Sequence, residues 1–263
     1  MINVLVNGAA GRMGQAVVAA VLDDPELNLV AAVDVHRGFD VGELVGKSLC
    51  GVILEDDLEV AIATHKPQVM VDFTRPNVVM ENICTALNAK VSPVVGTTGI
   101  SPADVEKIRA LAEQNDTPAF IAPNFAIGAV LMMVMARQAA KYMPDVEIIE
   151  LHHDNKLDAP SGTALQTAQM IAEVREEHEQ GHPDEKEKFA GARGADFKGM
   201  HIHSVRLPGF VAHQEVIFGG LGQTLTIRHD SLNRESFMPG VLLACKKVLS
   251  MKGLTVGLEK FLN

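Results

Sequence analysis

Short apolar runs alternate with segments of helical periodicity over the first part of the chain. Nearly continuous apolar runs, which indicate buried strands, occupy residues 2–6, 29–33, 69–73, 92–95 and 119–121. Apolar residues at helical spacing occupy residues 15–22, 77–88 and 102–114. Strands without alternation, interleaved with helices, are typical of a parallel sheet that is covered on both faces. This part of the chain is therefore predicted to form a Rossmann-type, doubly wound α/β sheet.

The pattern changes after residue 124. Helices are predicted at residues 128–142 and 163–177. Runs rich in β-branched residues, which indicate a mixed or antiparallel sheet, occupy residues 146–151, 201–207, 213–218 and 223–229. Residues 173–199 are dense in Glu, Lys, Gly and His, and we expect a helix end followed by a mobile, solvated loop. Residues 236–250 again have a helical pattern and are predicted to pack back on the first domain.

These changes divide the chain into two predicted domains. Residues 1–126, rejoined by residues 237–263, form the Rossmann-type domain. Residues 127–236 form a second α+β domain with a mixed or antiparallel sheet. The length of 263 residues agrees with two domains, because a domain typically holds roughly 100–200 residues.

A glycine-rich turn follows the first predicted strand and opens the first predicted helix. Residues 8–14 have the spacing Gly-x-x-Gly-x-x-Gly, in which glycines permit a tight turn and the helix N-terminus offers N–H groups to a pyrophosphate. Asp34 closes the next strand, 20 residues after Gly14, where a carboxylate can accept hydrogen bonds from the adenine-ribose hydroxyls. The glycines alone would fit an ordinary tight turn, but with Asp34 they predict a dinucleotide site.

The residues after Asp34 bear on the choice of dinucleotide. A carboxylate favours NAD, because it repels a 2′-phosphate. His36 and Arg37 follow immediately and can offset that repulsion. We therefore predict that both NADH and NADPH serve as cofactor.

Three further turns end predicted strands, at residues 72–74, 96–99 and 122–125. Ligands of open α/β sheets bind outside the carboxyl ends of the strands. Each turn alone is equally explained by ordinary turn chemistry. Their common placement favours a nicotinamide site at this edge of the sheet.

The segment at residues 150–164 combines a strand end, a histidine pair, a lysine and a helix start. Residues 158–161 are of types that begin helices, so the N–H groups near Gly162 and Thr163 would form an anion site suited to a carboxylate. Lys156 adds a positive charge to this site. The segment therefore predicts a carboxylate pocket.

Histidines supply the candidate acid of this pocket. Histidine is the side-chain type suited to proton transfer near neutral pH, so His152 or His153 is the candidate, although the pair would also fit an exposed position beside a helix cap. His201 and His203 would share a strand face, but no cysteine or metal-spaced carboxylate pair joins them. No metal site is therefore predicted, and these two histidines are expected to flank the substrate or to lie on the polar face of the sheet.

The composition and net charge argue against several classes of binding partner. Lys and Arg number 23 against 33 Asp and Glu, and the net charge of −10 lacks the basic footprint of a nucleic-acid binder. It also matches anionic membranes poorly, and the longest apolar run is too short to span a bilayer. The 3 cysteines are widely spaced and indicate neither a disulfide framework nor a thiolate metal site. We expect a cytoplasmic protein whose substrate is a small molecule.

Several of these motifs, taken in order along the chain, resemble one known family. They are the glycine turn at residues 8–14, Asp72-Phe73-Thr74, Gly96-Thr97-Thr98-Gly99, Asn124-Phe125, residues 150–164, residues 205–209 and residues 234–237. Together they are similar to 4-hydroxy-tetrahydrodipicolinate reductases, formerly called dihydrodipicolinate reductases, of lysine biosynthesis. The pattern His-His-x-x-Lys-x-Asp-Ala-Pro-Ser-Gly-Thr-Ala is far more specific than the glycine turn.

The resemblance implies reduction of a heterocyclic dicarboxylate to tetrahydrodipicolinate, with loss of water, by NADH or NADPH. It implies that His152 is a proton donor and acceptor, that Lys156 is a proton donor, and that His153, Gly162 and Thr163 hold the substrate. It further implies a homotetramer joined through the second domain, residues 127–236. The implied cofactor contacts are Gly8, Ala9, Ala10, Gly11, Arg12, Met13, Asp34, Gly96, Thr97, Thr98, Ala122, Pro123, Asn124 and Phe125.

Two local departures and two rival functions accompany this resemblance. Some members of the family have Glu-Arg where this chain has Asp34-Val35, and Ala126 stands where serine is common. The first rival function is another two-domain nicotinamide-dependent enzyme, such as a homoserine dehydrogenase or an aspartate dehydrogenase, which would not need the segment at residues 152–156. A dinucleotide-sensing protein without turnover would leave the histidine pair and the helix start at residues 161–163 unused.

Overall fold

The computed structural model describes residues 1–262, which form two compact units. The first unit joins Met1–Phe125 to the chain from Arg234 onward, and the second unit is Ala126–Asn233. The first unit therefore contains both ends of the described chain, and the second is one continuous segment.

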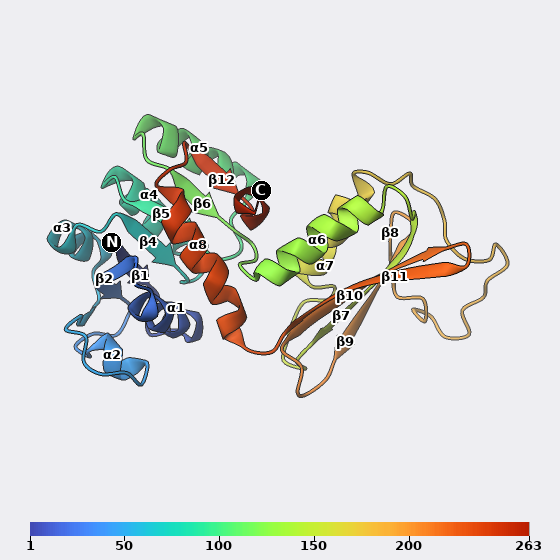
Figure 1. Ribbon diagram of the computed structural model, residues 1–263, viewed down its shortest axis with the longest axis horizontal. Coiled ribbons are helices and arrows are strands. Elements are labelled where there is room, and N and C mark those ends of the chain that lie inside the picture. Colours follow the sequence, from blue (N-terminus) through green and yellow to red (C-terminus); the bar gives the residue numbers. More distant parts are fainter. Residues whose placement is uncertain (263) are drawn as a thin grey trace. The chain divides into compact units, whose positions relative to one another are not determined.

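The first unit is built on a seven-stranded sheet with the order β12-β6-β5-β4-β1-β2-β3 (Figure 1). Every recorded pairing in it is parallel. Its strands are β1 (Ile2–Asn7), β2 (Leu27–Val33), β3 (Leu54–Glu55), β4 (Val69–Asp72), β5 (Ser92–Val95), β6 (Ala119–Ile121) and β12 (Leu254–Val256). The winding direction reverses between β1 and β4, so the carboxyl ends of these strands flank the crevice where such sheets bind ligands. The predicted Rossmann-type sheet is confirmed.

Helices alternate with these strands. They are α1 (Arg12–Asp23), α2 (Val41–Leu44), α3 (Leu58–His65), α4 (Val79–Asn88), α5 (Pro102–Gln114) and α8 (Met238–Val248), with 3₁₀ turns η1 (Arg234–Phe237) and η2 (Leu258–Phe261). Local chemistry fixes several starts: the Ser101 side chain caps α5 and the Asp57 side chain caps α3. The predicted helix at residues 236–250 is α8, whose first turn holds Pro239.

The end of the chain completes the first unit. Strand β12 pairs with β6, and the Phe261 ring stacks on Phe120 at 4.5 Å between centroids. Helix α8 packs against β1, β5 and β6. The last part of the chain therefore contributes both a strand and core side chains to a sheet begun by residue 2.

The second unit has a five-stranded sheet with the order β11-β10-β7-β9-β8. Its elements are α6 (Ile127–Ala139), β7 (Asp145–His152), α7 (Gly162–Ala172), β8 (Ala195–Phe197), β9 (Met200–Arg206), β10 (Ala212–Gly220) and β11 (Gln223–Ser231). Strands β7 and β9 are parallel and the other pairings are antiparallel, so the predicted mixed sheet is confirmed. Helices α6 and α7 contact each other and pack on the sheet (Figure 1).

The segment after α7 differs from the prediction. The helix expected to continue to residue 177 ends at Ala172. Just beyond it, the buried Arg175 guanidinium donates to the backbone oxygens of Pro144, His178 and Lys198. These hydrogen bonds hold the chain after Ala172 in a non-helical conformation. They also attach the two ends of the connection between residues 178 and 198 to the second unit.

No helix within residues 1–262 is long and apolar enough to cross a membrane.

Candidate functional site

The glycine turn between β1 and α1 has the close packing that the motif requires. Gly8 has φ +80°, and a Cβ there would lie 2.7 Å from the carbonyl oxygen of Phe73. A Cβ on Gly14 would collide with the Gly8 carbonyl and lie 2.8 Å from the Cα of Ala9. Helix α1 begins at Arg12, and the first N–H groups of a helix have no acceptor within it. The turn thus brings a helix N-terminus close to the end of β1, as a pyrophosphate site needs.

Asp34 follows β2 and contacts this turn directly. Its Oδ2 accepts a hydrogen bond from the Ala10 N–H at 2.9 Å, and its Oδ1 accepts one from the Val35 N–H at 2.8 Å. The carboxylate is therefore fixed beside the glycine turn, where an adenine ribose would lie. Arg37, expected to offset its charge, forms an exposed ion pair with Asp56 at 3.3 Å.

A buried aspartate joins the strand ends in the same unit. Asp72, at the end of β4, is fully buried and accepts hydrogen bonds from Asn7, Thr74, Asn82 and Thr97. These donors come from β1, from α4 and from the turns after β4 and β5. Asp72 was predicted only as part of a turn, yet its carboxylate also fixes the turn that carries Thr97 beside β1.

Aromatic packing completes this edge of the sheet. The Phe73 and Phe125 ring centroids lie 5.8 Å apart, and a Cβ on Gly96 would collide with the Phe73 ring. The structure thus brings together the predicted cofactor residues of the first unit at the carboxyl ends of β1, β2, β4, β5 and β6. Of the later ones, Phe125, Ala122 and Thr97 are buried, whereas Thr98 and Pro123 are exposed.

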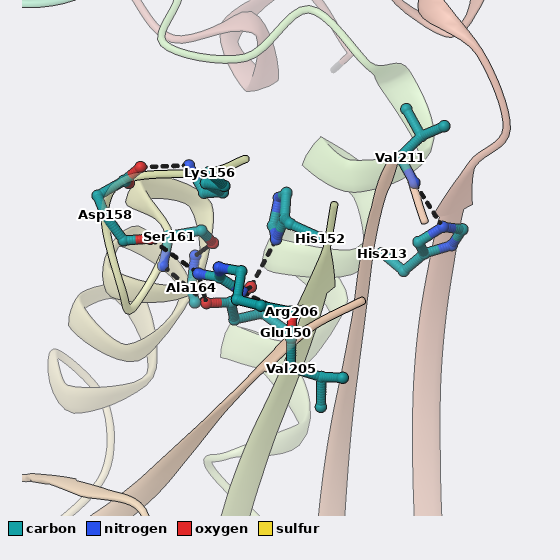
Figure 2. A network of polar contacts seen from close by, with 10 residues as sticks. All are labelled: Glu150, His152, Lys156, Asp158, Ser161, Ala164, Val205, Arg206, Val211 and His213. Carbon is teal, nitrogen blue, oxygen red and sulfur yellow. Dashed lines mark hydrogen bonds and ion pairs between the residues drawn. The ribbon is translucent and has the colours of Figure 1, made fainter. Parts of the chain in front are cut away.

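A second polar group gathers around Glu150 in the other unit (Figure 2). Glu150 lies near the end of β7, and its side chain is fully buried. Arg206, on the neighbouring strand β9, donates to both carboxylate oxygens at 2.7 Å. The Ser161 N–H donates to Oε1 at 3.1 Å, and the His152 Nδ1 lies 2.5 Å from Oε2. This carboxylate therefore connects β7, β9 and the start of α7.

The partners of Glu150 determine its charge. Burial alone raises the pKa of its carboxyl group, but hydrogen bonds from His152, Arg206 and Ser204 outweigh burial and lower that pKa to about 2. Glu150 is therefore ionised at neutral pH and accepts hydrogen bonds only.

The contacts continue from Glu150 to Lys156. The Arg206 Nη2 also donates to the Asp158 backbone oxygen at 2.8 Å, and the Lys156 Nζ lies 2.6 Å from Asp158 Oδ1. The hydrogen bond from Lys156 is the main cause that lowers the pKa of Asp158. His152 and Lys156, the two predicted proton-transfer residues, are thus joined by a continuous set of contacts, which Figure 2 shows.

The start of α7 lies at the same place. Ser161 is its N-cap, and the Ser161 hydroxyl accepts from the Ala164 N–H at 3.2 Å. Gly162 and Thr163 occupy the first turn, and no atom lies within 4 Å of a Cβ built on Gly162. The predicted helix start is confirmed, and the positive end of the helix favours an anion there.

The two adjacent histidines differ in their surroundings. His152 ends β7 with its side chain 14% exposed, whereas His153 follows the strand and is exposed. Only His152 has its ring against Glu150. The structure thereby distinguishes two residues that the sequence left as alternatives.

Neither Glu150 nor Arg206 had a predicted role. Period-two alternation along β7 places Glu150 on the same face as the buried Val146 and Ile148. An acidic residue at a position that belongs to the core requires a cationic partner. That signal was present in the sequence, but it does not identify Arg206, which lies 56 residues away along the chain.

His201 and His203 do not join this site. The His203 Nε2 lies 2.8 Å from Glu147 Oε2, and His201 lines a cavity of about 590 Å³ with residues of the segment 177–199. No predicted site residue lines that cavity. Within residues 1–262, no group of three or more His, Cys, Asp or Glu side chains could hold a metal ion.

Glu150 makes the stability of the protein depend on pH. Its folded-state pKa of about 2 lies below the ordinary 4.5, so its stabilising contribution is present above pH 4.5 and is lost as pH falls toward 2. From pH 6 to pH 3, the difference in unfolding free energy between the wild type and Glu150→Gln is expected to shrink by about 2 kcal/mol. Urea unfolding of both proteins at the two pH values measures this, and an unchanged difference would contradict it.

Known protein families and relatives match this chain over nearly its whole length. A family described as "Dihydrodipicolinate reductase, N-terminus" matches residues 2–125, and "Dihydrodipicolinate reductase, C-terminus" matches residues 128–262. A 4-hydroxy-tetrahydrodipicolinate reductase of Desulfitobacterium hafniense is 57% identical over 264 residues, which cover 100% of this chain and 99% of that protein. Another, from Halalkalibacterium halodurans, is 54% identical over 264 residues and covers 100% of both chains.

Solved structures agree with this match. The dipicolinate-bound dihydrodipicolinate reductase from Paenisporosarcina sp. TG-14 is 50% identical, has a TM-score of 0.88, and is matched over 99% of both chains. An amine dehydrogenase from Mycobacterium smegmatis has a TM-score of 0.69 at 15% identity, over 97% of this chain and 94% of that one. The second likeness shows a shared fold alone.

Proposed function

The chain belongs to the dihydrodipicolinate reductase family, and from this membership we infer that it reduces 4-hydroxy-tetrahydrodipicolinate to tetrahydrodipicolinate with NAD(P)H. The reaction loses water and is a step of diaminopimelate and lysine biosynthesis. The observation that carries the inference is the continuous set of contacts from His152 to Lys156 at the start of α7. These contacts hold a histidine, which can transfer a proton, and a lysine cation near the start of α7, where we propose that the dicarboxylate binds.

The first unit, Met1–Phe125 with the chain from Arg234 onward, is proposed to bind the dinucleotide. Its glycine turn fits a pyrophosphate, because a Cβ on Gly8 or Gly14 would meet backbone atoms, so these glycines allow the tight turn that brings the start of α1 close to β1. Asp34 would receive the adenine-ribose hydroxyls. The proposed contacts are Gly8, Ala9, Ala10, Gly11, Arg12, Met13, Asp34, Gly96, Thr97, Thr98, Ala122, Pro123, Asn124 and Phe125.

The second unit, Ala126–Asn233, is proposed to bind the substrate. The substrate is a dianion, and Lys156 together with the N-terminal end of α7 supplies positive potential in a chain of net charge −10. His153, Gly162 and Thr163 would hold the carboxylates. Lys156 and Arg206 balance the charges of Asp158 and Glu150 there, so the acidic excess of the chain does not extend to these paired groups.

The residues of the chain and the cofactor divide the chemistry. When bound, the cofactor supplies a hydride, and the net reaction also takes up a proton. His152 and Lys156 would exchange protons with the substrate, and Arg206 and Asp158 hold them in place through the contacts of Figure 2.

An absorbance assay at the NADH band, with substrate freshly made from pyruvate and aspartate semialdehyde, tests this function. Substrate-dependent oxidation of NADH or NADPH is expected. Its absence, with NADH still bound, would favour a dinucleotide-sensing protein. Reduction of NAD by homoserine or aspartate would favour an amino-acid dehydrogenase.

Both NADH and NADPH are expected to support turnover. Asp34 favours the free 2′-hydroxyl of NADH. Arg37 follows three residues later and pairs with Asp56 at the surface, and we propose that it receives the 2′-phosphate of NADPH. The ratio of kcat/KM for the two cofactors is expected to stay within about a thousandfold. Arg37→Ala should lower kcat/KM for NADPH and leave that for NADH unchanged. A larger preference in either direction, or equal losses for both cofactors, would contradict the prediction.

We further propose a homotetramer joined through the second unit, in the cytoplasm. Strand β11 is an edge of the five-stranded sheet, and its residues from Gln223 to Thr226 are exposed in the single chain. An exposed edge strand is a ready surface for pairing with another chain. Light scattering of the purified protein gives the mass that checks the proposal.

A further inference from the structure

Glu150 occupies a position where a carboxylate costs free energy. It faces the same side of β7 as Val146 and Ile148, which are 1% and 0% exposed, and its own side chain is 0% exposed. A buried charge without partners is strongly unfavourable. Arg206, which donates to both oxygens, already supplies the opposite charge that such a carboxylate needs.

Since Arg206 already balances the charge of Glu150, the contact between Glu150 and His152 is not needed for that purpose. An ionised carboxylate has no proton to donate, so the hydrogen between Glu150 Oε2 and His152 Nδ1, 2.5 Å apart, must belong to the imidazole. The other ring nitrogen, Nε2, then carries a lone pair in the neutral ring and a proton in the charged ring. The side that faces Glu150 is occupied, so only Nε2 remains for the substrate.

We propose that Glu150 is a positioning residue, which holds the proton of His152 on Nδ1 and thereby makes Nε2 the atom that exchanges a proton with the substrate. This inference rests on the proposed function of His152 and identifies the reacting nitrogen. Glu150 touches neither substrate nor cofactor in this scheme. It acts by fixing the tautomer and the orientation of the ring, and it stabilises the imidazolium when Nε2 takes a proton.

The same carboxylate also fixes His152 relative to the other proton-transfer residue. Arg206 connects Glu150 to the backbone of Asp158, and the side chain of Asp158 holds Lys156. Ser161, the N-cap of α7, donates its backbone N–H to Glu150 Oε1, the same oxygen that accepts from Arg206 Nη2. A change at Glu150 is therefore expected to alter the alignment of the proton-transfer groups more than the affinity for substrate.

The test is Glu150→Gln, which keeps the shape of the side chain and removes its charge. An amide N–H would face Nδ1, so the imidazole would accept there and move its proton to Nε2. We expect kcat to fall about 10²–10⁴-fold, with KM changed less than tenfold, because loss of a group that orients a catalytic histidine has effects of this size. Nitrogen NMR of the labelled protein, with the signal assigned through His152→Gln, should show the exchange of tautomers.

The chain offers a matched control in Glu147. It lies on the same strand and also pairs with a histidine and an arginine, His203 at 2.8 Å and Arg193 at 2.6 Å. Glu147→Gln removes an equal charge from a second Glu-His-Arg group, which is partly exposed and does not contact His152. Its kcat is expected to stay within threefold of the wild type.

Three outcomes would overturn the inference. They are a kcat for Glu150→Gln within threefold of the wild type, an unchanged tautomer in that variant, and an equal loss of kcat in Glu147→Gln. If Glu150→Gln does not fold, NMR of the wild type decides alone: a neutral His152 with its proton on Nε2 refutes the inference, and a proton on Nδ1 supports it. A wild type without reductase activity would refute the proposed function, while the tautomer would still test the role of Glu150.

Discussion

Lys156→Ala is expected to lower kcat/KM for the dicarboxylate by about 10²–10⁴-fold, because it removes both a positive charge and a proton source from the site. Lys156 Nζ lies 2.6 Å from Asp158 Oδ1, and the lysine belongs to the connection between β7 and α7 and not to the buried core, so its removal leaves the core intact. The unfolding temperature should therefore change little. Steady-state kinetics and thermal unfolding of the same preparation measure the two effects.

Lys156→Arg separates charge from proton transfer. Arginine keeps the positive charge but does not release a proton in proteins. We expect KM to return toward the wild-type value while kcat stays low. Lys141→Ala is the matched control, because Lys141 lies in the same unit and its recorded bond is to Gln138. Near-full turnover in both Lys156→Ala and His152→Ala would refute the assignment of these residues.

Gly14→Ala is expected to weaken NADH binding at least tenfold and to destabilise the first unit by about 1–3 kcal/mol. A Cβ at this position meets the backbone of Gly8 and Ala9, not a flexible side chain, so the start of α1 must move away from β1. The movement displaces the N–H groups that would hold the pyrophosphate. Fluorescence titration with NADH and thermal unfolding measure the two losses.

Gly219→Ala is the control for this substitution. A Cβ on Gly219 would lie 3.8 Å from its nearest neighbour, the Cβ of Asp145, which is an ordinary contact. It should leave NADH binding unchanged. If Gly14→Ala binds NADH as tightly as Gly219→Ala does, the glycine turn is not the pyrophosphate site.

The strands that could be predicted from the sequence are those in which consecutive residues are apolar and buried. Strands such as β1, β4 and β5 are apolar runs buried on both faces, and the turns after them carry their own glycine and threonine signals. Strands β3, β8 and β12 and helices α2 and α3 were missed. Leu54–Glu55 is too short to show periodicity, and it becomes a strand only because β2 offers it a hydrogen-bonding edge. Such elements are decided by tertiary pairing, which a local pattern does not contain.

The site was predictable as a set of residues but not as a network. The histidine pair, the lysine and the helix start are adjacent in sequence, and the structure places them together. The choice between His152 and His153 was left open, because the predicted strand ended at residue 151. In the structure β7 continues to His152, and period-two alternation then places His152 on the same face as Glu150, two residues before it.

The position of β12 affects how the protein is made on the ribosome. The first unit lacks α8 and β12 until the last residues have been synthesised, whereas Ala126–Asn233 is already continuous. At roughly 5–20 residues per second, β6 and Phe120 wait roughly 7–28 s for their partners β12 and Phe261. During that interval β6 is an open edge that another nascent chain can pair with. The inserted unit can therefore fold while the first unit still lacks its last strand.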